Sequence, residues 1–148
     1  MNHNFKQFPE LTNAQMDEFY FESPHRQITQ DFRAHVHKVH DGDTITVKTD
    51  FRDFNFPIRF LDINAKELSE ERGHSTRDWL KEQIEKTEVD IQIDPDNRVD
   101  KWGRLLGRVI SRGLNMGNTM LRLGMVTTFN ARNEGKIPNI NTTVKGWF

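Results

Sequence analysis

From Arg33 onward, apolar side chains recur at every second position, and this alternation constrains the fold more than any other feature of the sequence. Three short segments show it in succession: residues 33–40, 43–50 and 56–62. Successive side chains of a β-strand point to opposite faces, so Ile45 and Val47 would share one face of the second segment. Gly42 marks the first turn between these strands. The pattern therefore predicts three consecutive antiparallel strands.

The second half of the chain alternates between helical and strand patterns. The predicted elements are a helix over 75–86, strands over 88–94 and 104–111, and a short helix from Asn115 to Gly124. Ser75 with Asp78 resembles a capping pair at the start of the first helix. Five short strands with two interleaved helices are typical of a small closed barrel of the OB type. The expected fold class is α+β, mainly β, with an N-terminal helical extension.

The chain divides into three parts by composition. Residues 1–32 read as an extension, 33–132 as the barrel domain and 133–148 as an Asn- and Thr-rich tail. In the extension, Thr12 and Gln15 fit a capping box, and Leu11 and Met16 fit a hydrophobic staple. The extension is predicted to contain a helix whose apolar stripe packs on the domain, covering a surface that a C-terminal helix would otherwise cover. An oligomer contact is the alternative.

Composition excludes several classes of protein. The chain has 148 residues, a mean hydropathy of −0.78 and a net charge of −1, so nucleic-acid binding gains no support from global charge. Any phosphate recognition must be local. Cysteine is absent, which excludes disulfides and thiol chemistry. No apolar run reaches membrane-spanning length and residues 1–10 show no secretory signal, so the expected location is cytoplasmic, with no membrane partner.

Three separated polar clusters supply the chemistry: Asp41-Gly42-Asp43-Thr44, residues 59–67 and Asp100-Lys101-Trp102-Gly103-Arg104. Hard divalent cations take oxygen ligands, and carboxylates can accept a proton from an attacking water. Arginine forks bind phosphate oxygens bidentately. Any one cluster alone is typical of a turn, a solvated strand face or an ion-paired loop. Together, they form the inventory that a metal-assisted phosphodiester hydrolase needs.

These clusters, in their order and spacing, resemble the staphylococcal (thermonuclease-like) nuclease family over about residues 33–130. The resemblance implies a five-stranded OB barrel that hydrolyses DNA or RNA with calcium, or another divalent cation, to give 3′-phosphate ends. It implies catalytic roles for Arg59, Glu67 and Arg104. It also implies metal ligation by Asp43, Asn64 and the backbone carbonyl of Ala65, with Asp41 in support. Four further residues would contact substrate: Lys101, Trp102, Phe129 and Arg132.

The sequence departs from the family pattern at several of these positions. Asn64 replaces an aspartate ligand, which removes one negative charge and predicts weaker calcium binding. Lys66 replaces the proline before Glu67 and places a cation beside that carboxylate. Trp102 replaces a tyrosine. The tyrosines that stack the base are also missing, which leaves Phe129 or Arg132 for that role.

These residues are compatible with three functions. The first is the metal-dependent nuclease, favoured by Arg59, Glu67 and Arg104. The second is a weak or inactive nucleic-acid-binding OB module, favoured by Asn64 and the missing tyrosines. The third is a scaffold subunit that self-associates through its extension or tail. The three histidines of segment 33–40 would need a fourth ligand for a zinc site and are predicted to lie on the surface.

Overall fold

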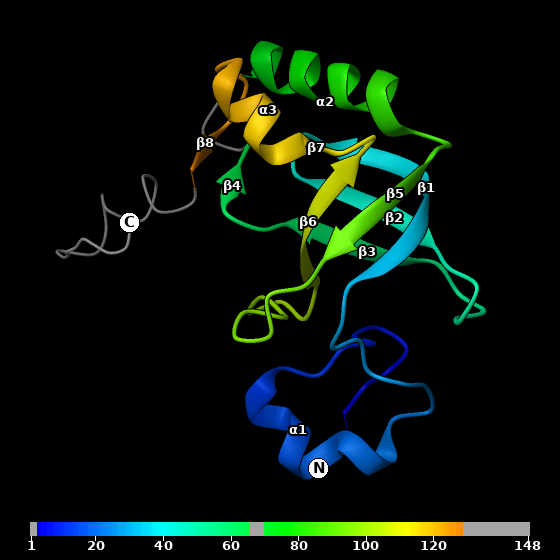
Figure 1. The fold of residues 1–148 in the computed structure, drawn as a ribbon. Helices are drawn as coiled ribbons and strands as arrows, with labels where there is room; N and C mark the ends of the chain where they lie inside the picture. The colour runs from blue at the N-terminus through cyan, green and yellow to red at the C-terminus, as the bar shows by residue number, and fades with distance from the viewer. Residues whose placement is uncertain (1–2, 66–69, 129–148) are drawn as a thin grey trace, which may run out of the picture.

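The computed structural model of the chain describes residues 3–65 and 70–128, and a closed barrel forms its centre (Figure 1). Its five strands are β1 (Phe32–Asp41), β2 (Thr44–Lys48), β3 (Phe56–Phe60), β5 (Glu88–Gln92) and β6 (Leu105–Ser111). They run in the order β3-β2-β1-β5-β6, and β3 also pairs with β6 in parallel. This last pairing joins the two ends of the sheet. The predicted mainly β fold with a five-stranded OB-type barrel is confirmed.

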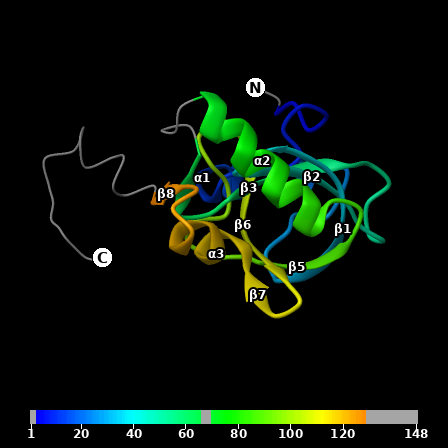
Figure 2. The ribbon, with the colours of Figure 1, turned by 90° about the horizontal axis from the view of Figure 1, so that it is seen from above.

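Helices and short strands close one end of the barrel. These elements are β4 (Ile63–Asn64), α2 (Glu70–Ile84), β7 (Leu114–Asn115), α3 (Met116–Arg122) and β8 (Thr127–Thr128). Helix α2 lies across the barrel end, with α3 beside it in both views (Figures 1 and 2). Strand β8 pairs with β4, so the chain after α3 returns beside the segment that follows β3.

The predicted start of the long helix was wrong. Helix α2 begins at Glu70, and Ser75 lies inside it rather than at its cap. The first turns are polar and contain no apolar repeat, so periodicity could reveal only the half that packs on the barrel, where Leu80 and Ile84 are fully buried.

The short helix was predicted correctly: Asn115 caps α3 by accepting a hydrogen bond from the Asn118 amide, and Gly124 follows it with φ +72°.

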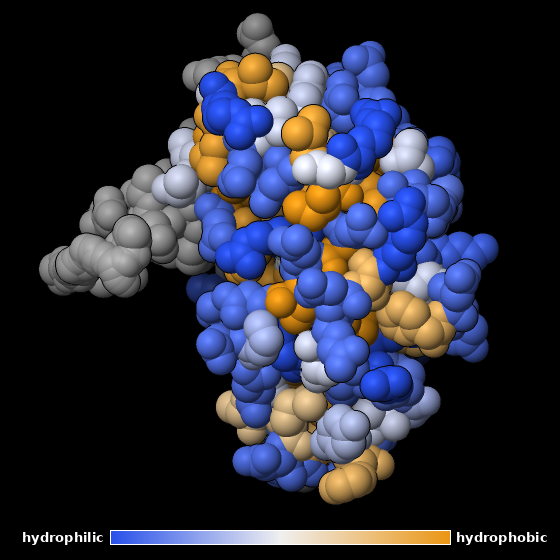
Figure 3. All heavy atoms as spheres, viewed as in Figure 1, coloured by the Kyte–Doolittle hydropathy of each residue, from blue (hydrophilic) through white to orange (hydrophobic). Residues whose placement is uncertain are grey.

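The barrel core consists of the alternating residues that the sequence singled out. Ile45, Val47, Ile58 and Phe60 are buried, and their neighbours on β5, β6, α2 and α3 complete one continuous cluster. Figure 3 shows hydrophilic and apolar side chains intermixed on the face seen in Figure 1. Among the described residues, no helix combines the length and the hydropathy needed to cross a membrane.

The N-terminal extension lies at the barrel end opposite α2 (Figure 1). It contains α1 (Asn13–Phe19) and the 3-10 turn η1 (Tyr20–Glu22). The predicted capping box is present, with Thr12 and Gln15 exchanging side-chain and backbone hydrogen bonds. No residue of α1 is buried, however. The apolar stripe of the helix is therefore not the feature that fixes the extension to the barrel.

A buried carboxylate just before α1 makes that attachment. Glu10 is 2% exposed, and its two oxygens form ion pairs with Arg52 and Arg98. Its Oε1 also accepts the Ile28 amide at 2.9 Å. The charged partners come from the β2–β3 connection and the β5–β6 connection, so one side chain links three distant parts of the chain.

The two arginines bind the extension through its backbone as well. Arg98 donates to the carbonyls of Ile28 at 2.8 Å and Leu11 at 3.0 Å, and Arg52 donates to that of Arg26 at 3.0 Å. The Arg52 guanidinium lies 4.6 Å from the centre of the Phe56 ring, a cation–π arrangement. Because breaking a buried pair leaves an uncompensated charge, this cluster should be intolerant of losing its central member.

We expect Glu10→Gln to lower the free energy of unfolding by about 3 kcal/mol, since it leaves two buried guanidinium groups without a counter-charge. Urea unfolding monitored by circular dichroism measures the change. Glu18→Gln, the same substitution at an exposed position of α1, is the control and should change stability by less than about 0.5 kcal/mol. Equal unfolding midpoints for the two variants would contradict this account.

Candidate functional site

Strand pairing brings the first two polar clusters together. Thr44 of β2 pairs with Arg59 of β3, and the Phe60 amide donates to the Asp43 carbonyl at 2.8 Å. The turn that joins β1 to β2 therefore lies beside the end of β3. The third cluster precedes β6, the parallel neighbour of β3.

Asp43 is the centre of this arrangement. It is 1% exposed, and its Oδ1 accepts the Thr44 hydroxyl at 3.0 Å. Its Oδ2 accepts the Ala65 amide at 2.9 Å and lies 3.4 Å from Nη2 of Arg59. Although burial raises the pKa of this carboxyl, the hydrogen bond with Asp41 and the charge of Arg59 outweigh it and leave the pKa lowered. Asp43 is thus a buried, ionised carboxylate.

Asp41 occupies a contrasting environment next to it. Its Oδ1 accepts the Asp43 amide at 3.0 Å. Burial, together with the side-chain hydrogen bond to Asp43 and the charge of Asp43, raises the pKa of Asp41 to about 6. The two neighbouring carboxyl groups therefore differ in pKa, and Asp43 ionises at a lower pH than Asp41.

Arg59 is held by the segment that follows its own strand. Its Nη1 donates to the carbonyls of Phe60 at 2.7 Å and Ile63 at 2.8 Å. The residue is 7% exposed, and burial lowers its pKa against the opposing effect of Asp43. Within residues 3–65 and 70–128, its Nε makes no hydrogen bond, and this edge of the guanidinium can bind another oxygen. The side chain is much less exposed than that of a surface arginine.

Asn64 and Ala65 lie beside this pair. Both are buried, and Thr127 of β8 donates to the Asn64 carbonyl at 3.1 Å. The structure therefore brings together Asp41, Asp43 and the Ala65 backbone near one arginine, and Asn64 is the buried residue that precedes Ala65.

The third cluster forms a tight, charged loop. Asp100 Oδ1 accepts the amides of Trp102 and Arg104, both at 2.9 Å, and its Oδ2 accepts Nε of Arg104 at 2.8 Å. Gly103 has φ +85°, a conformation that favours glycine. Within the described part of the chain, the terminal nitrogens of Arg104 make no hydrogen bond. They are available to an external anion.

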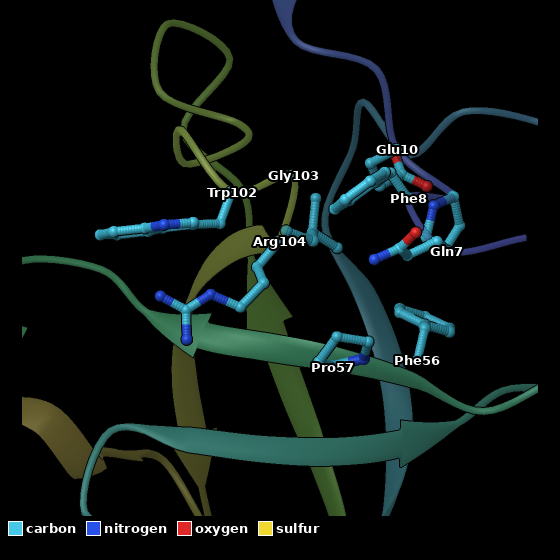
Figure 4. Close-up of a pocket in the computed structure, with 10 residues that line it drawn as sticks. Gln7, Phe8, Glu10, Phe56, Pro57, Trp102, Gly103 and Arg104 are labelled. Atoms are coloured by element: carbon cyan, nitrogen blue, oxygen red, sulfur yellow. The ribbon is translucent and has the colours of Figure 1, made fainter. Parts of the chain in front are cut away.

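Trp102 is 58% exposed, and two cations lie near its ring. Lys101 Nζ lies 4.6 Å from the ring centroid, and the Arg104 guanidinium carbon lies 5.4 Å from it. Figure 4 shows the Arg104 guanidinium under the indole ring. The charge of Arg104 also lowers the pKa of Arg59, which places the two arginines within electrostatic reach of each other.

The donors near Asp43 fit a hard divalent cation in kind but are few in number. Two adjacent carboxyl groups that do not both ionise freely, and a buried carboxamide, are oxygen ligands of the type calcium takes. Among residues 3–65 and 70–128, however, no group of three or more His, Cys, Asp or Glu is arranged to hold a metal ion. Within the same residues, the histidines of β1 form no such metal-binding group either, and His35 pairs with Glu88.

Comparison with known proteins agrees with this geometry. The family described as staphylococcal nuclease homologue matches residues 57–145, more than half of the chain. The chain belongs to the staphylococcal nuclease family. No curated protein matches it. The family segment includes Arg59, Asn64 and the loop ending in Arg104, whereas the turn with Asp43 lies just before it.

Several residues predicted from the staphylococcal nuclease pattern lie outside the described residues. These are Glu67, its neighbour Lys66, Phe129 and Arg132. The tail over 133–148 lies there too. Their roles stay predictions.

The structure also reveals a residue pair whose importance the sequence pattern missed. Gly42 is buried against α2: a Cβ built on it would lie 2.6 Å from Thr76 Cγ2 and 3.1 Å from Ala65 Cβ. The Thr76 hydroxyl donates to the Met125 carbonyl at 3.1 Å, which fixes the threonine. Glycine in this turn could be predicted from turn chemistry, but its contact with a helix thirty-odd residues away could not.

We expect Gly42→Ala to destabilise the protein by about 1–3 kcal/mol, because the new methyl group overlaps the Thr76 side chain. Thr76→Ser removes the overlapping Cγ2 and keeps the hydroxyl, so it should restore part of the loss in the double variant. A double-mutant cycle by thermal unfolding measures this coupling. Additive single effects, with no coupling energy, would exclude the proposed contact.

Proposed function

We propose that this chain is a divalent-cation-dependent nuclease that hydrolyses phosphodiester bonds of DNA or RNA to give 3′-phosphate ends. The observation that supports it best is the buried ion pair of Asp43 and Arg59, within electrostatic reach of the partly exposed Arg104. Two guanidinium groups near a buried carboxylate suit a dianionic transition state at phosphorus. Membership of the nuclease family supports the same reaction.

Each residue has a part in this proposal. Arg104 binds a non-bridging phosphate oxygen through its free terminal nitrogens, while Asp100 fixes its orientation through Nε. Arg59 offers its Nε edge to the same phosphate and holds Asp43 in place. Glu67 accepts the proton of the attacking water, as the family resemblance implies. Lys101 and Trp102 bind the flanking chain, and Phe129 or Arg132 stacks a base.

Calcium, or a similar divalent cation, would be held by Asp43, Asn64 and the Ala65 carbonyl, with Asp41 in support. When bound, it supplies charge that polarises the phosphate and lowers the pKa of a bound water. The two neighbouring carboxyl groups are suited to this because a dication would offset the burial and the charge of Asp43, both of which raise the pKa of Asp41. Asn64 contributes no charge, so the cation should be held weakly.

A binding module without catalysis is the second candidate. Both oxygens of Asp43 already accept hydrogen bonds from the protein, and its neighbour Asn64 is neutral. An OB barrel with a cationic loop and an exposed tryptophan could bind a single strand without cleaving it. A scaffold role is the third candidate. One digestion assay, of single-stranded DNA with calcium, separates the three candidate functions.

For the nuclease, calcium-dependent digestion of single-stranded DNA should stop in EDTA. Arg104→Lys should lower kcat/KM by about 100-fold, because lysine cannot replace the fork that Asp100 orients. Glu67→Ala should lower it by about 100-fold or more. Arg108→Lys is the control, since Arg108 lies on β6, the strand that follows Arg104, and pairs with Asp62. Binding without cleavage by the unmodified chain would support the module instead, and neither activity would support the scaffold.

We expect Asn64→Asp to tighten calcium binding by about tenfold, because it adds a negative ligand beside Asp43. Calcium titration followed by the thermal melting temperature gives the affinity without relying on activity. In EDTA the same variant should melt at a lower temperature than the unmodified chain, since a further carboxylate is then buried unneutralised. Unchanged calcium affinity would remove Asn64 from the proposed metal site.

A further inference from the structure

A pocket of about 440 Å³ lies between the N-terminal extension and the Asp100–Arg104 loop. Gln7, Phe8 and Pro9 form one wall, and Trp102, Gly103 and Arg104 form the other, with Phe56 and Pro57 at the base (Figure 4). This volume lies within the range of about 300–1,000 Å³ that small-ligand pockets occupy. Neither Arg59 nor Asp43 lines it, so it is a site separate from the ion pair described above.

From this pocket we infer a subsite for one nucleotide of a single strand, next to the nucleotide whose phosphate is cleaved. The inference rests on the proposed function. It assigns the N-terminal extension a role in substrate binding, which extends the site beyond the barrel that carries the chemistry.

The walls are held firmly enough to form such a site. A Cβ built on Gly103 would lie 2.7 Å from the Phe8 ring, so the extension packs directly against the loop. Behind Phe8, the Pro9 carbonyl accepts the Gln27 side-chain amide at 2.9 Å. The ion pairs of Glu10 then fix this segment to the barrel. The pocket therefore depends on the extension remaining docked.

The lining suits a nucleotide in both charge and shape. Phe8 and the exposed Trp102 provide ring surfaces, and every base has a π-face that can stack on such surfaces. Gln7 is exposed at the rim, where its carboxamide can donate to and accept from a base edge. Lys101 and Arg104, which both lie near the Trp102 ring, supply positive charge for the connecting phosphate.

Continuity with the proposed reaction centre selects the occupant. Arg104 lines the pocket and also provides the free terminal nitrogens proposed to bind the scissile phosphate. A group that occupies the pocket while the scissile phosphate is bound to Arg104 must lie next to that phosphate. The neighbouring nucleotide of the same strand meets this condition.

The test uses the full-length protein and a fluorescein-labelled oligothymidylate of eight residues, with binding measured by fluorescence anisotropy in EDTA at low salt. Gln7→Glu places a negative charge at the rim and should weaken binding by about tenfold. Gln30→Glu makes the same change at an exposed position of the extension outside the pocket, and should bind within about twofold of the unmodified chain. Melting temperatures establish that both variants are folded.

A second pair of variants tests the stacking surface. Trp102→Ala should weaken binding by about tenfold, whereas Phe21→Ala, which removes a 97% exposed aromatic ring of η1, should not. Equal affinities of Gln7→Glu and Gln30→Glu would overturn the subsite, even if the unmodified chain digests DNA and the nuclease proposal stands. If the unmodified chain neither binds nor cleaves the strand, the subsite and the proposed function fail together.

Discussion

The parallel pairing of β3 with β6 is the constraint on which the rest of the structure depends. The other strand pairs of the barrel are antiparallel, and this pair alone joins the two ends of its sheet among the described residues. It places the charged loop before β6 alongside β3, although residues 61–99 of the chain lie between them. Without this closure, Arg104 and the ion pair of Arg59 with Asp43 would belong to separate surfaces. The chemistry is thus a product of barrel topology rather than of local sequence.

Much of this arrangement could be predicted from the sequence, because the barrel strands obey the alternation of a half-buried sheet. Ile45, Val47, Ile58 and Phe60 lie in the core as their spacing indicates. The beginning of α2 could not be found in this way, because the sequence of its first turns is polar and carries no apolar repeat. Periodicity detects a helix only where apolar side chains recur at helical spacing.

The candidate site, too, could be predicted only in part from the sequence. The clusters that contain Asp43, Arg59 and Arg104 are visible as motifs, and the pairing of strands makes them neighbours. Their protonation and accessibility depend on tertiary contacts instead. Arg59 is buried because the carbonyls of Phe60 and Ile63 bind it, and no pattern in the sequence predicts that. Nor does the sequence reveal that Glu10 is buried, since acidic residues before a helix are usually exposed. Long-range ion pairs leave no periodic signal.

The ion pairs of Glu10 also set an order on folding. Its partners Arg52 and Arg98 lie 42 and 88 residues further along the chain. During synthesis the extension leaves the ribosome before the barrel strands, yet its docking site is incomplete until the connection between β5 and β6 has been made. Contacts of such long range form late, because the loop-closure entropy must be overcome before they stabilise anything. A segment that is synthesised before the barrel is therefore among the last to reach its place.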